Sequence, residues 1–150
     1  MTDFQLLLKK GQVGEVAAIK YFSNITEVND KTDYTKNKYD QKKGFDFEYL
    51  NRKTDTWDRA EVKTNISEAN LTFFELYNKH QDLGWFYTSK ADIVVIYSVY
   101  TKKLYWYDLK KMRNYIQKRA NDGTLKLSYP KDGSIGTWLP VSFYLIKELK

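Results

Sequence analysis

The chain of 150 residues is 42% hydrophobic and 29% charged, a balance that fits one folded domain over 1–150 and excludes a disordered chain. It has no cysteine and a single histidine, His80, which excludes disulfides, thiolate metal sites and multi-histidine zinc sites. Lys and Arg number 25 against 19 Asp and Glu, and the resulting net charge of +6 favours a polyanionic partner, either nucleic acid or an acidic membrane surface.

No stretch of the sequence has the length of a signal peptide core or a membrane span. The N-terminal segment MTDFQLLLKK contains a run of only three leucines, and the longest apolar run, 93–100, is too short to cross a bilayer. We therefore expect a cytoplasmic protein with no membrane partner.

The first predicted element is an amphipathic helix. Apolar residues over 4–22 recur close to helical spacing. Gly11 and Gly14 weaken the centre of this pattern, so the helix is expected to begin only near Gly11. Glu15 would then lie on a helix that packs beside the sheet.

A polar loop is predicted over 24–43, with one short strand near 25–28, and a strand follows it. Aromatic residues at positions 45, 47 and 49 alternate with polar or aliphatic ones over 45–50. This is strand spacing, and it predicts that Asp46 and the three aromatic side chains lie on opposite faces.

A second strand is predicted over 60–65, after a charged turn over 51–58. Because strand side chains alternate between faces, Glu61 and Lys63 project on the same side, roughly 6–7 Å apart along the strand. The intervening Val62 belongs to the opposite, core-facing side.

The later elements complete a mixed α/β architecture. The β-favouring run 71–77 predicts a third strand carrying Glu75, and the apolar run 93–100 predicts a strand covered on both faces, within a hairpin. Asp108 is a predicted N-cap of a helix that continues to Arg119. The expected order is a helix, a three-strand antiparallel meander, and a further hairpin and helix.

Asp46, Glu61 and Lys63 form the candidate site. If the first two strands pair with Asp46 on the Glu61 face, two carboxylates and an ammonium group meet at one end of a small sheet. Such a cluster can hold a divalent metal ion and act on a phosphodiester. The alternative is a solvated sheet face with a cross-strand ion pair, which contributes less than about 1 kcal/mol to stability.

Two segments, GFDF at 44–47 and AEVKT at 60–64, resemble the PD-(D/E)xK nuclease superfamily. The resemblance extends less specifically to Glu15 and to segment 84–92. Phe45 stands where a proline gives the superfamily its name, and that proline varies widely among its members. The chain looks most like small phage or bacterial nucleases, including Holliday-junction resolvase-like proteins. The resemblance implies a restriction-endonuclease-like core and a Mg²⁺-dependent endodeoxyribonuclease, a phosphodiester hydrolase.

The chemistry of phosphodiester hydrolysis explains these residue types independently of the resemblance and suggests a role for each. Asp46 and Glu61 would bind Mg²⁺, which Mn²⁺ can replace, and the Val62 backbone carbonyl would be a third ligand. Lys63 would orient or deprotonate the attacking water, or neutralise the phosphate. Glu15 is a further catalytic candidate. Glu75 is a candidate for the outer ligand sphere or for a second metal ion.

Basic and aromatic side chains supply candidate contacts to DNA. The basic group that flanks the proposed site comprises Lys42, Lys43, Arg52, Lys53 and Arg59. A second basic group, on the last predicted helix, comprises Lys110, Lys111, Arg113, Lys118 and Arg119. Candidates for stacking on single-stranded bases are Trp57, Trp85 and Tyr87. For each group the alternative is an ordinary solvated or core position.

Three functions stay open at this point. The first is a Mg²⁺-dependent endodeoxyribonuclease that acts on branched or otherwise structured DNA. The second is a catalytically inactive nucleic-acid-binding module on the same fold, and the third is a small phage-type protein-interaction domain. One site per chain cuts one strand at a time, so cleavage of both strands or of a junction would require a homodimer.

Overall fold

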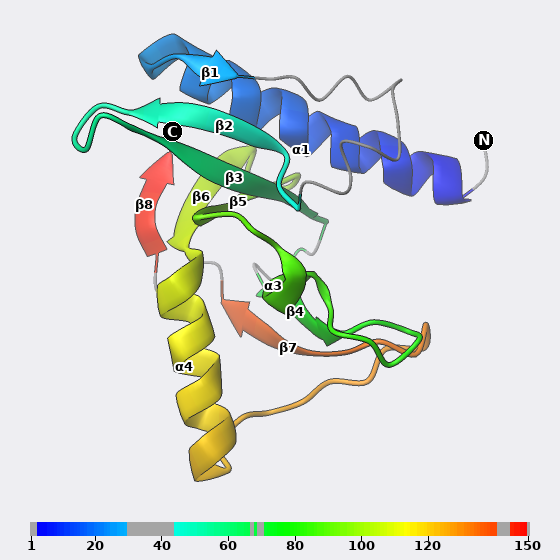
Figure 1. Cartoon of the computed structure of the whole chain (residues 1–150). Coiled ribbons are helices and arrows are strands. Elements are labelled where there is room, and N and C mark those ends of the chain that lie inside the picture. Colours follow the sequence, from blue (N-terminus) through cyan, green and yellow to red (C-terminus); the bar gives the residue numbers. More distant parts are fainter. Residues whose placement is uncertain (1–2, 30–43, 67, 69–70, 141–144, 150) are drawn as a thin grey trace.

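The computed structural model describes residues 3–29, 44–66, 68, 71–140 and 145–149, with side chains described within 12–140 (Figure 1). The elements are α1 (Asp3–Ile25), β1 (Val28–Asn29), β2 (Phe47–Asn51), β3 (Thr56–Asn65), β4 (Leu71–Tyr77), α3 (Trp85–Thr88), β5 (Ile93–Ser98), β6 (Lys103–Asp108), α4 (Leu109–Asp122), β7 (Ile135–Pro140) and β8 (Leu145–Leu149). None of the helices in these ranges is both long and apolar enough to cross a membrane.

The main sheet has six strands in the order β1-β2-β3-β5-β6-β8. Only β3 and β5 are parallel, and the other neighbours are antiparallel. This arrangement confirms the predicted mixed α/β class. The helix α1 lies across one face of the sheet, and α3, α4 and a second sheet lie on the other side (Figure 1).

The predicted three-strand meander is wrong in its third member. The strand over 71–77 exists as β4, but it pairs with β7 in a separate two-stranded sheet, and β5 occupies the position beside β3. Residues 93–96 of β5 are all buried, which suits a strand in the centre of a sheet. Buried and more exposed side chains alternate along β4, so it needs cover on one face only.

The helix α1 begins at Asp3 and not near Gly11. It passes through Gly14, where an added Cβ atom would clash with the Thr64 hydroxyl on β3. The glycine therefore allows close approach of helix and sheet, and its low helix propensity, about 1 kcal/mol, is offset by burial of Ala18 and Phe22 further along the same helix.

The end of the main sheet leads directly into α4. The hairpin of β5 and β6 is confirmed, and the Asp108 carboxylate accepts a hydrogen bond from the Lys111 N–H at 3.0 Å, which confirms the predicted N-cap. The helix extends beyond the predicted end at Arg119 and stops at Gly123, whose φ of 76° is left-handed.

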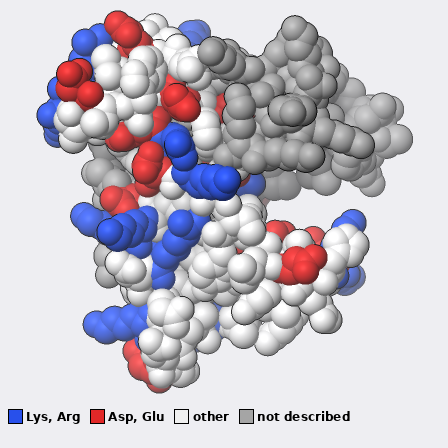
Figure 2. All heavy atoms as spheres, viewed as in Figure 1, with Lys and Arg blue, Asp and Glu red and all other residues white. Residues whose placement is uncertain are grey.

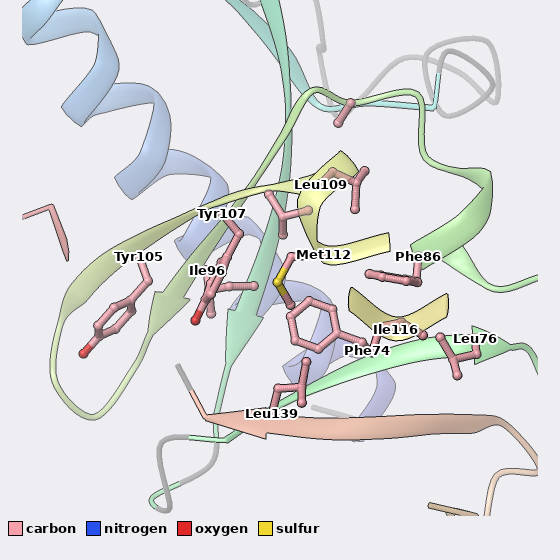
Figure 3. Close-up of a cluster of buried hydrophobic side chains, with 12 residues drawn as sticks. Phe74, Leu76, Phe86, Ile96, Tyr105, Tyr107, Leu109, Met112, Ile116 and Leu139 are labelled. Atoms are coloured by element: carbon pink, nitrogen blue, oxygen red, sulfur yellow. The ribbon is translucent and has the colours of Figure 1, made fainter. Parts of the chain in front are cut away.

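Two buried clusters make up the core. The cluster between α1 and the sheet comprises Ala18, Phe22, Phe47, Tyr49, Ala60, Val62, Ile93, Val95 and Leu104. The cluster on the opposite side of the sheet includes Phe74, Leu76, Phe86, Val94, Ile96, Tyr107, Leu109, Met112, Ile116 and Leu139 (Figure 3). Successive residues of β3 consequently face different layers: Ala60 and Val62 face α1, and Glu61 faces the layer that contains α3.

Candidate functional site

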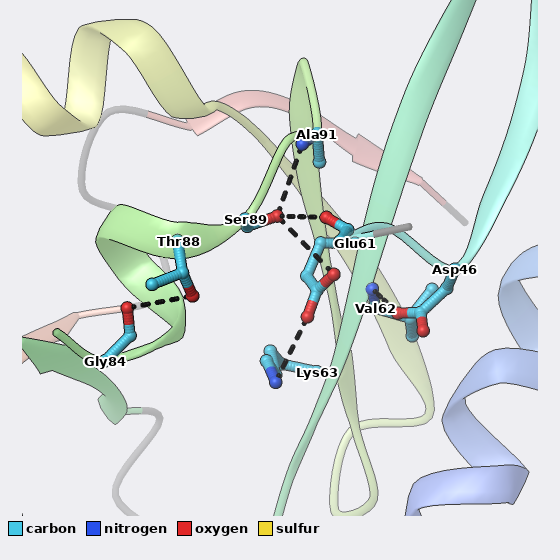
Figure 4. Close-up of polar contacts among 9 residues, drawn as sticks. Asp46, Glu61, Val62, Lys63, Gly84, Thr88, Ser89 and Ala91 are labelled. Carbon is cyan, nitrogen blue, oxygen red and sulfur yellow. Dashed lines mark hydrogen bonds and ion pairs between the residues drawn. The ribbon is translucent and has the colours of Figure 1, made fainter. Parts of the chain in front are cut away.

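Asp46 lies just before β2, where the chain bends around Gly44, whose φ is 75°. The Asp46 N–H donates to the Ala60 carbonyl at 2.8 Å, and its Oδ2 accepts the Val62 N–H at 2.6 Å (Figure 4). β2 begins only at Phe47, so it offers no backbone partner to the Val62 N–H of β3. The Asp46 carboxylate accepts this hydrogen bond instead.

The predicted alternation over 45–50 holds only from Phe47 onward. Phe47 and Tyr49 belong to the cluster under α1, but Phe45 packs against the opposite cluster, so its predicted side is wrong. The reason is that 44–46 form a bend and not a strand. The same bend lets the Asp46 carboxylate reach the backbone of Val62 at the edge of β3.

The Val62 carbonyl faces the same edge as Asp46. In a strand, the N–H and C=O of one residue point toward the same neighbouring strand. Because the Val62 N–H donates to Asp46, the Val62 carbonyl is directed to the Asp46 side of β3. A backbone oxygen and a carboxylate therefore share one edge.

Glu15 approaches the site from α1 and is hydrogen-bonded to the Asp46 side chain. Burial raises the pKa of Asp46, and this effect is opposed by the Val62 N–H, the Lys63 charge and the Glu15 bond. The three groups thus hold Asp46 in a largely desolvated position.

Glu61 projects from the other side of β3, away from α1 (Figure 4). The expectation that Asp46 lies on the Glu61 face is therefore wrong, because Asp46 belongs to the bend before β2 and its side chain is turned toward Glu15 of α1. Its side chain is 13% exposed; Oε1 lies 3.2 Å from Lys63 Nζ, and Oε2 lies 3.5 Å from the Ser89 hydroxyl (Figure 4). Burial raises the pKa of Glu61 to about 7, Lys63 lowers it, and the Asp46 charge raises it further. The charges of Asp46 and Glu61 therefore disfavour each other.

Lys63 has contacts on two sides. Besides Glu61, its Nζ lies 4.7 Å from the centroid of the Trp85 ring, a cation–π contact. The Lys63 side chain is nonetheless 34% exposed. One face of the Trp85 ring is therefore occupied by Lys63, and stacking of a base on Trp85 stays a prediction.

The structure thus brings together Asp46, Glu61, Lys63 and Glu15 around β3. Glu75 lies on β4 in the second sheet, opposite Gly136, because β4 does not join the meander. Within the described part of the chain, no three acidic or histidine side chains lie close enough to hold a metal ion between them. A Mg²⁺ ion needs only one or two carboxylates, because it keeps several of its waters, so Asp46, Glu61 and a backbone carbonyl are a suitable donor set.

The predicted DNA-contacting residues fall into separate places. Lys42 and Lys43 lie outside the described residues. Arg52 and Lys53 occupy the tip of the β2–β3 hairpin, and β3 extends roughly 17 Å from Thr56 at this tip to Glu61. Arg59 is nearer to Glu61 along β3, and its guanidinium carbon lies 5.2 Å from the ring centroid of Phe45, the residue before Asp46 in the chain. Figure 2 shows Lys and Arg side chains between the sheet and α4 on one face, with acidic side chains among them.

Arg113 does not belong to an exposed basic group as predicted. It is half-buried and donates hydrogen bonds to the carbonyls of Phe86, Tyr87 and Ser89. Sequence reasoning also gave no role to Ser89, although it lies within the segment 84–92. No local signal could have identified these residues, because their partners are distant in sequence.

Comparisons with known proteins give little further information. No family model matches the sequence, and none of the curated proteins matches it. Among solved structures, a bacterial homing endonuclease, I-Ssp6803I, is similar with a TM-score of 0.49 and 14% sequence identity, over 76% of this chain and 74% of that chain. At this level of likeness, the function has to be argued from the site itself.

Proposed function

We propose that this protein is a Mg²⁺-dependent endodeoxyribonuclease that hydrolyses phosphodiester bonds. The observation that supports the proposal is the burial of two mutually repelling carboxylates, Asp46 and Glu61, on either side of β3 beside the Lys63 ammonium. Burying both charges opposes folding, and a divalent cation bound at the edge of β3, where both carboxylates would have to reach it, would remove this cost. Strongly perturbed carboxylates at one spot are also typical of catalytic sites.

The residues fit Mg²⁺ in type as well as in charge. The Asp46 and Glu61 carboxylates and the Val62 carbonyl are oxygen ligands, which this ion prefers, and they would hold it at the edge of β3. When bound, the ion supplies Lewis-acid stabilisation of the phosphoryl oxygens and lowers the pKa of a coordinated water. Mn²⁺, which takes similar ligands, is expected to substitute.

Lys63 is the residue that would contact the substrate. One of its N–H donors is directed to Glu61, and the remaining donors of the partly exposed ammonium are available to a phosphate oxygen or to the attacking water. Its position is fixed by Glu61 on one side and by Trp85 on the other. Glu15 would act on the reaction through its bond to Asp46.

DNA would approach along the side of β3 that carries Arg59. This guanidinium is exposed and packs over the Phe45 ring, and it would bind a backbone phosphate. Arg52 and Lys53 would contact the duplex about 17 Å away, at the tip of the hairpin. Binding should then weaken as salt concentration rises. Cleavage of both strands or of a junction would require two copies of the site.

The test is a cleavage assay with the purified protein. Supercoiled, linear, branched and single-stranded DNA are incubated with Mg²⁺, with Mn²⁺ or with EDTA, alongside the Lys63→Ala variant. We expect cutting with either metal, none in EDTA, and none by the variant. Equal cutting by the wild type and by Lys63→Ala would exclude this site as its source.

A second candidate function is DNA binding without cleavage. It is favoured by the finding that no three acidic side chains within the described residues converge on one metal position. Salt-sensitive binding without cutting on any of the four substrates would select this function. If the protein neither binds nor cuts DNA, the protein-interaction domain remains.

A further inference from the structure

The short helix α3 is held in place by one arginine from another helix. Its last carbonyls have no partner within so short a helix. Arg113 Nε donates to the Phe86 carbonyl at 2.9 Å, and Nη2 donates to the carbonyls of Tyr87 at 3.2 Å and Ser89 at 2.6 Å. A planar guanidinium with several fixed donors suits this task, which a lysine ammonium cannot reproduce.

The base of Arg113 is itself fixed by the core. Met112 and Ile116, on the same turn and the next turn of α4, are fully buried. Phe86 of α3 belongs to the same cluster (Figure 3). Core packing therefore fixes the position of the helix at Arg113. The hydrogen bonds of Arg113 in turn fix the connection between α3 and β5.

The connection between α3 and β5 affects Asp46 through its contacts with Gly44. The Ser89 hydroxyl donates to the Gly44 carbonyl at 3.0 Å, and the Lys90 N–H donates to the same carbonyl at 2.8 Å. Gly44 is in the left-handed region and begins the bend that leads to Asp46. The position of Asp46 at the edge of β3 thus depends on the α3–β5 connection.

The same segment also contacts Glu61 and Lys63. The Ser89 hydroxyl lies 3.5 Å from Glu61 Oε2, and it also accepts the Ala91 N–H at 3.2 Å (Figure 4). At the other end of α3, the Trp85 ring lies 4.7 Å from Lys63 Nζ. One segment of chain therefore contacts Glu61 and Lys63 directly and Asp46 through Gly44.

We infer that Arg113 is a positioning residue of the site. By binding the carbonyls of Ser89 and α3, it keeps the side chains of Asp46, Glu61 and Lys63 in fixed positions relative to one another. It does not bind DNA phosphates. The part of this inference that concerns cleavage depends on the proposed nuclease function, whereas the part that concerns geometry does not.

The test compares four variants: Arg113→Lys, Arg113→Ala, Ser89→Ala and the control Lys126→Ala. Lys126 is exposed and lies after α4, so its replacement removes one positive charge without touching α3. Cleavage is measured in single turnovers at saturating DNA with Mg²⁺. Binding is measured in EDTA over a range of salt concentrations.

We expect Arg113→Lys to lower the saturated cleavage rate by about 10- to 100-fold, as loss of a residue that orients metal ligands usually does. Its DNA affinity and the salt dependence of binding should match those of the wild type. Ser89→Ala should show a smaller loss of the same kind, and Lys126→Ala none. An Arg113→Lys protein that cleaves at the wild-type rate, or an Arg113→Ala protein whose main defect is weaker, less salt-dependent binding, would overturn the inference.

Hydrogen exchange separates this inference from the proposed function. Even if the wild type cuts no DNA, amides over 44–46 and 85–91 should exchange faster in Arg113→Lys than in Lys126→Ala, while amides of β5 and β6 stay protected. Unchanged exchange over both segments would overturn the positioning role, whatever the outcome of the cleavage assay. The exchange pattern also detects an Arg113→Ala variant that has simply unfolded.

Discussion

Two clusters of polar side chains around buried or half-buried acids occur on the same pair of strands, one around Asp58 and one around Asp46 and Glu61, and they differ in the partners of the acids. At the hairpin end, Asp58 accepts hydrogen bonds from the Asn51 amide at 2.8 Å and from the Tyr49 hydroxyl at 3.3 Å. Its partners are neutral and belong to the same hairpin. At the other end, Asp46 and Glu61 contact a backbone N–H, a lysine, Glu15 of α1 and Ser89, the residue that follows α3.

The contacts of Asp58 are explained by their contribution to stability, whereas the burial of Asp46 and Glu61 is not. Asp58 links the two strands near the hairpin turn, and its bonds stabilise that turn. Burial raises the pKa values of both Asp46 and Glu61, so their charged forms oppose folding. An arrangement that opposes folding and draws on several elements is better explained by a ligand, and the ligand we propose is a Mg²⁺ ion.

Replacing the acids of the two clusters one at a time should give the largest contrast. Asp46→Asn and Glu61→Gln should each lower Mg²⁺-dependent cleavage by about 100-fold or more, because each removes a charged ligand from the reacting centre. Asp58→Asn should cleave DNA at the wild-type rate. Single-turnover rates at saturating DNA measure this, and an equal loss in Asp58→Asn would remove the distinction between the two clusters.

The pH dependence of folding should distinguish the same two clusters. Because burial raises the pKa of Glu61 from 4.5 to about 7, the folded protein retains a proton that the unfolded chain loses between these values. The free energy of unfolding should therefore fall by up to about 3 kcal/mol as the pH rises from 4.5 to 7. Glu61→Gln should lack this component, and Asp58→Asn should keep it.

Urea unfolding at pH 4.5 and pH 8 measures the effect. Adding Mg²⁺ at pH 8 should restore stability to the wild type and to Asp58→Asn, but much less to Glu61→Gln, because a ligand that binds only the folded state stabilises it. A pH dependence that is the same in all three proteins would show that Glu61 titrates normally.

A third variant tests whether close packing of α1 is what keeps the site cluster buried. Gly14→Ala places a methyl group against the Thr64 hydroxyl, so α1 must move away from β3 and carry Glu15 with it. We expect a loss of about 1–3 kcal/mol in the free energy of unfolding, with reduced cleavage. Gln12→Ala, at an exposed position on the same helix, should change neither quantity. Wild-type stability in Gly14→Ala would mean that the helix already stands further from the sheet.

The smallest effect is expected from the cation–π contact of Lys63. Trp85→Leu keeps an apolar side chain but removes the aromatic face, and such a contact contributes up to about 2 kcal/mol, so cleavage should fall by no more than about 30-fold. Trp138→Leu, on β7 and 44% exposed, is the matched control and should not change the rate. A loss as severe as in Lys63→Ala would assign Trp85 a direct role in catalysis.

The sequence predicted the part of the site that depends on local periodicity. Alternation over 60–65 placed Glu61 and Lys63 on one side of a strand, and helical spacing placed Glu15 on the first helix. Asp46 was correctly associated with this strand, although it reaches Val62 by way of a bend that strand alternation does not describe.

The remaining features depend on contacts between distant segments. β4 has strand-like sequence, but nothing within it shows that its partner is β7, more than 50 residues later. The start of α1 was misjudged because Gly14 lowers helix propensity locally, while its benefit arises at Thr64. Arg113 was predicted to be a surface cation, because nothing in its own helix shows that its three carbonyl partners lie in a distant segment.

The most direct test of the central claim is an anomalous difference map from crystals of the wild-type protein grown with Mn²⁺. The account predicts a peak about 2.0–2.5 Å from oxygen atoms of both Asp46 and Glu61, near the Val62 carbonyl, and no such peak in Glu61→Gln. A map without a peak between these two carboxylates, or with the metal bound at the Asp58 cluster, would contradict it.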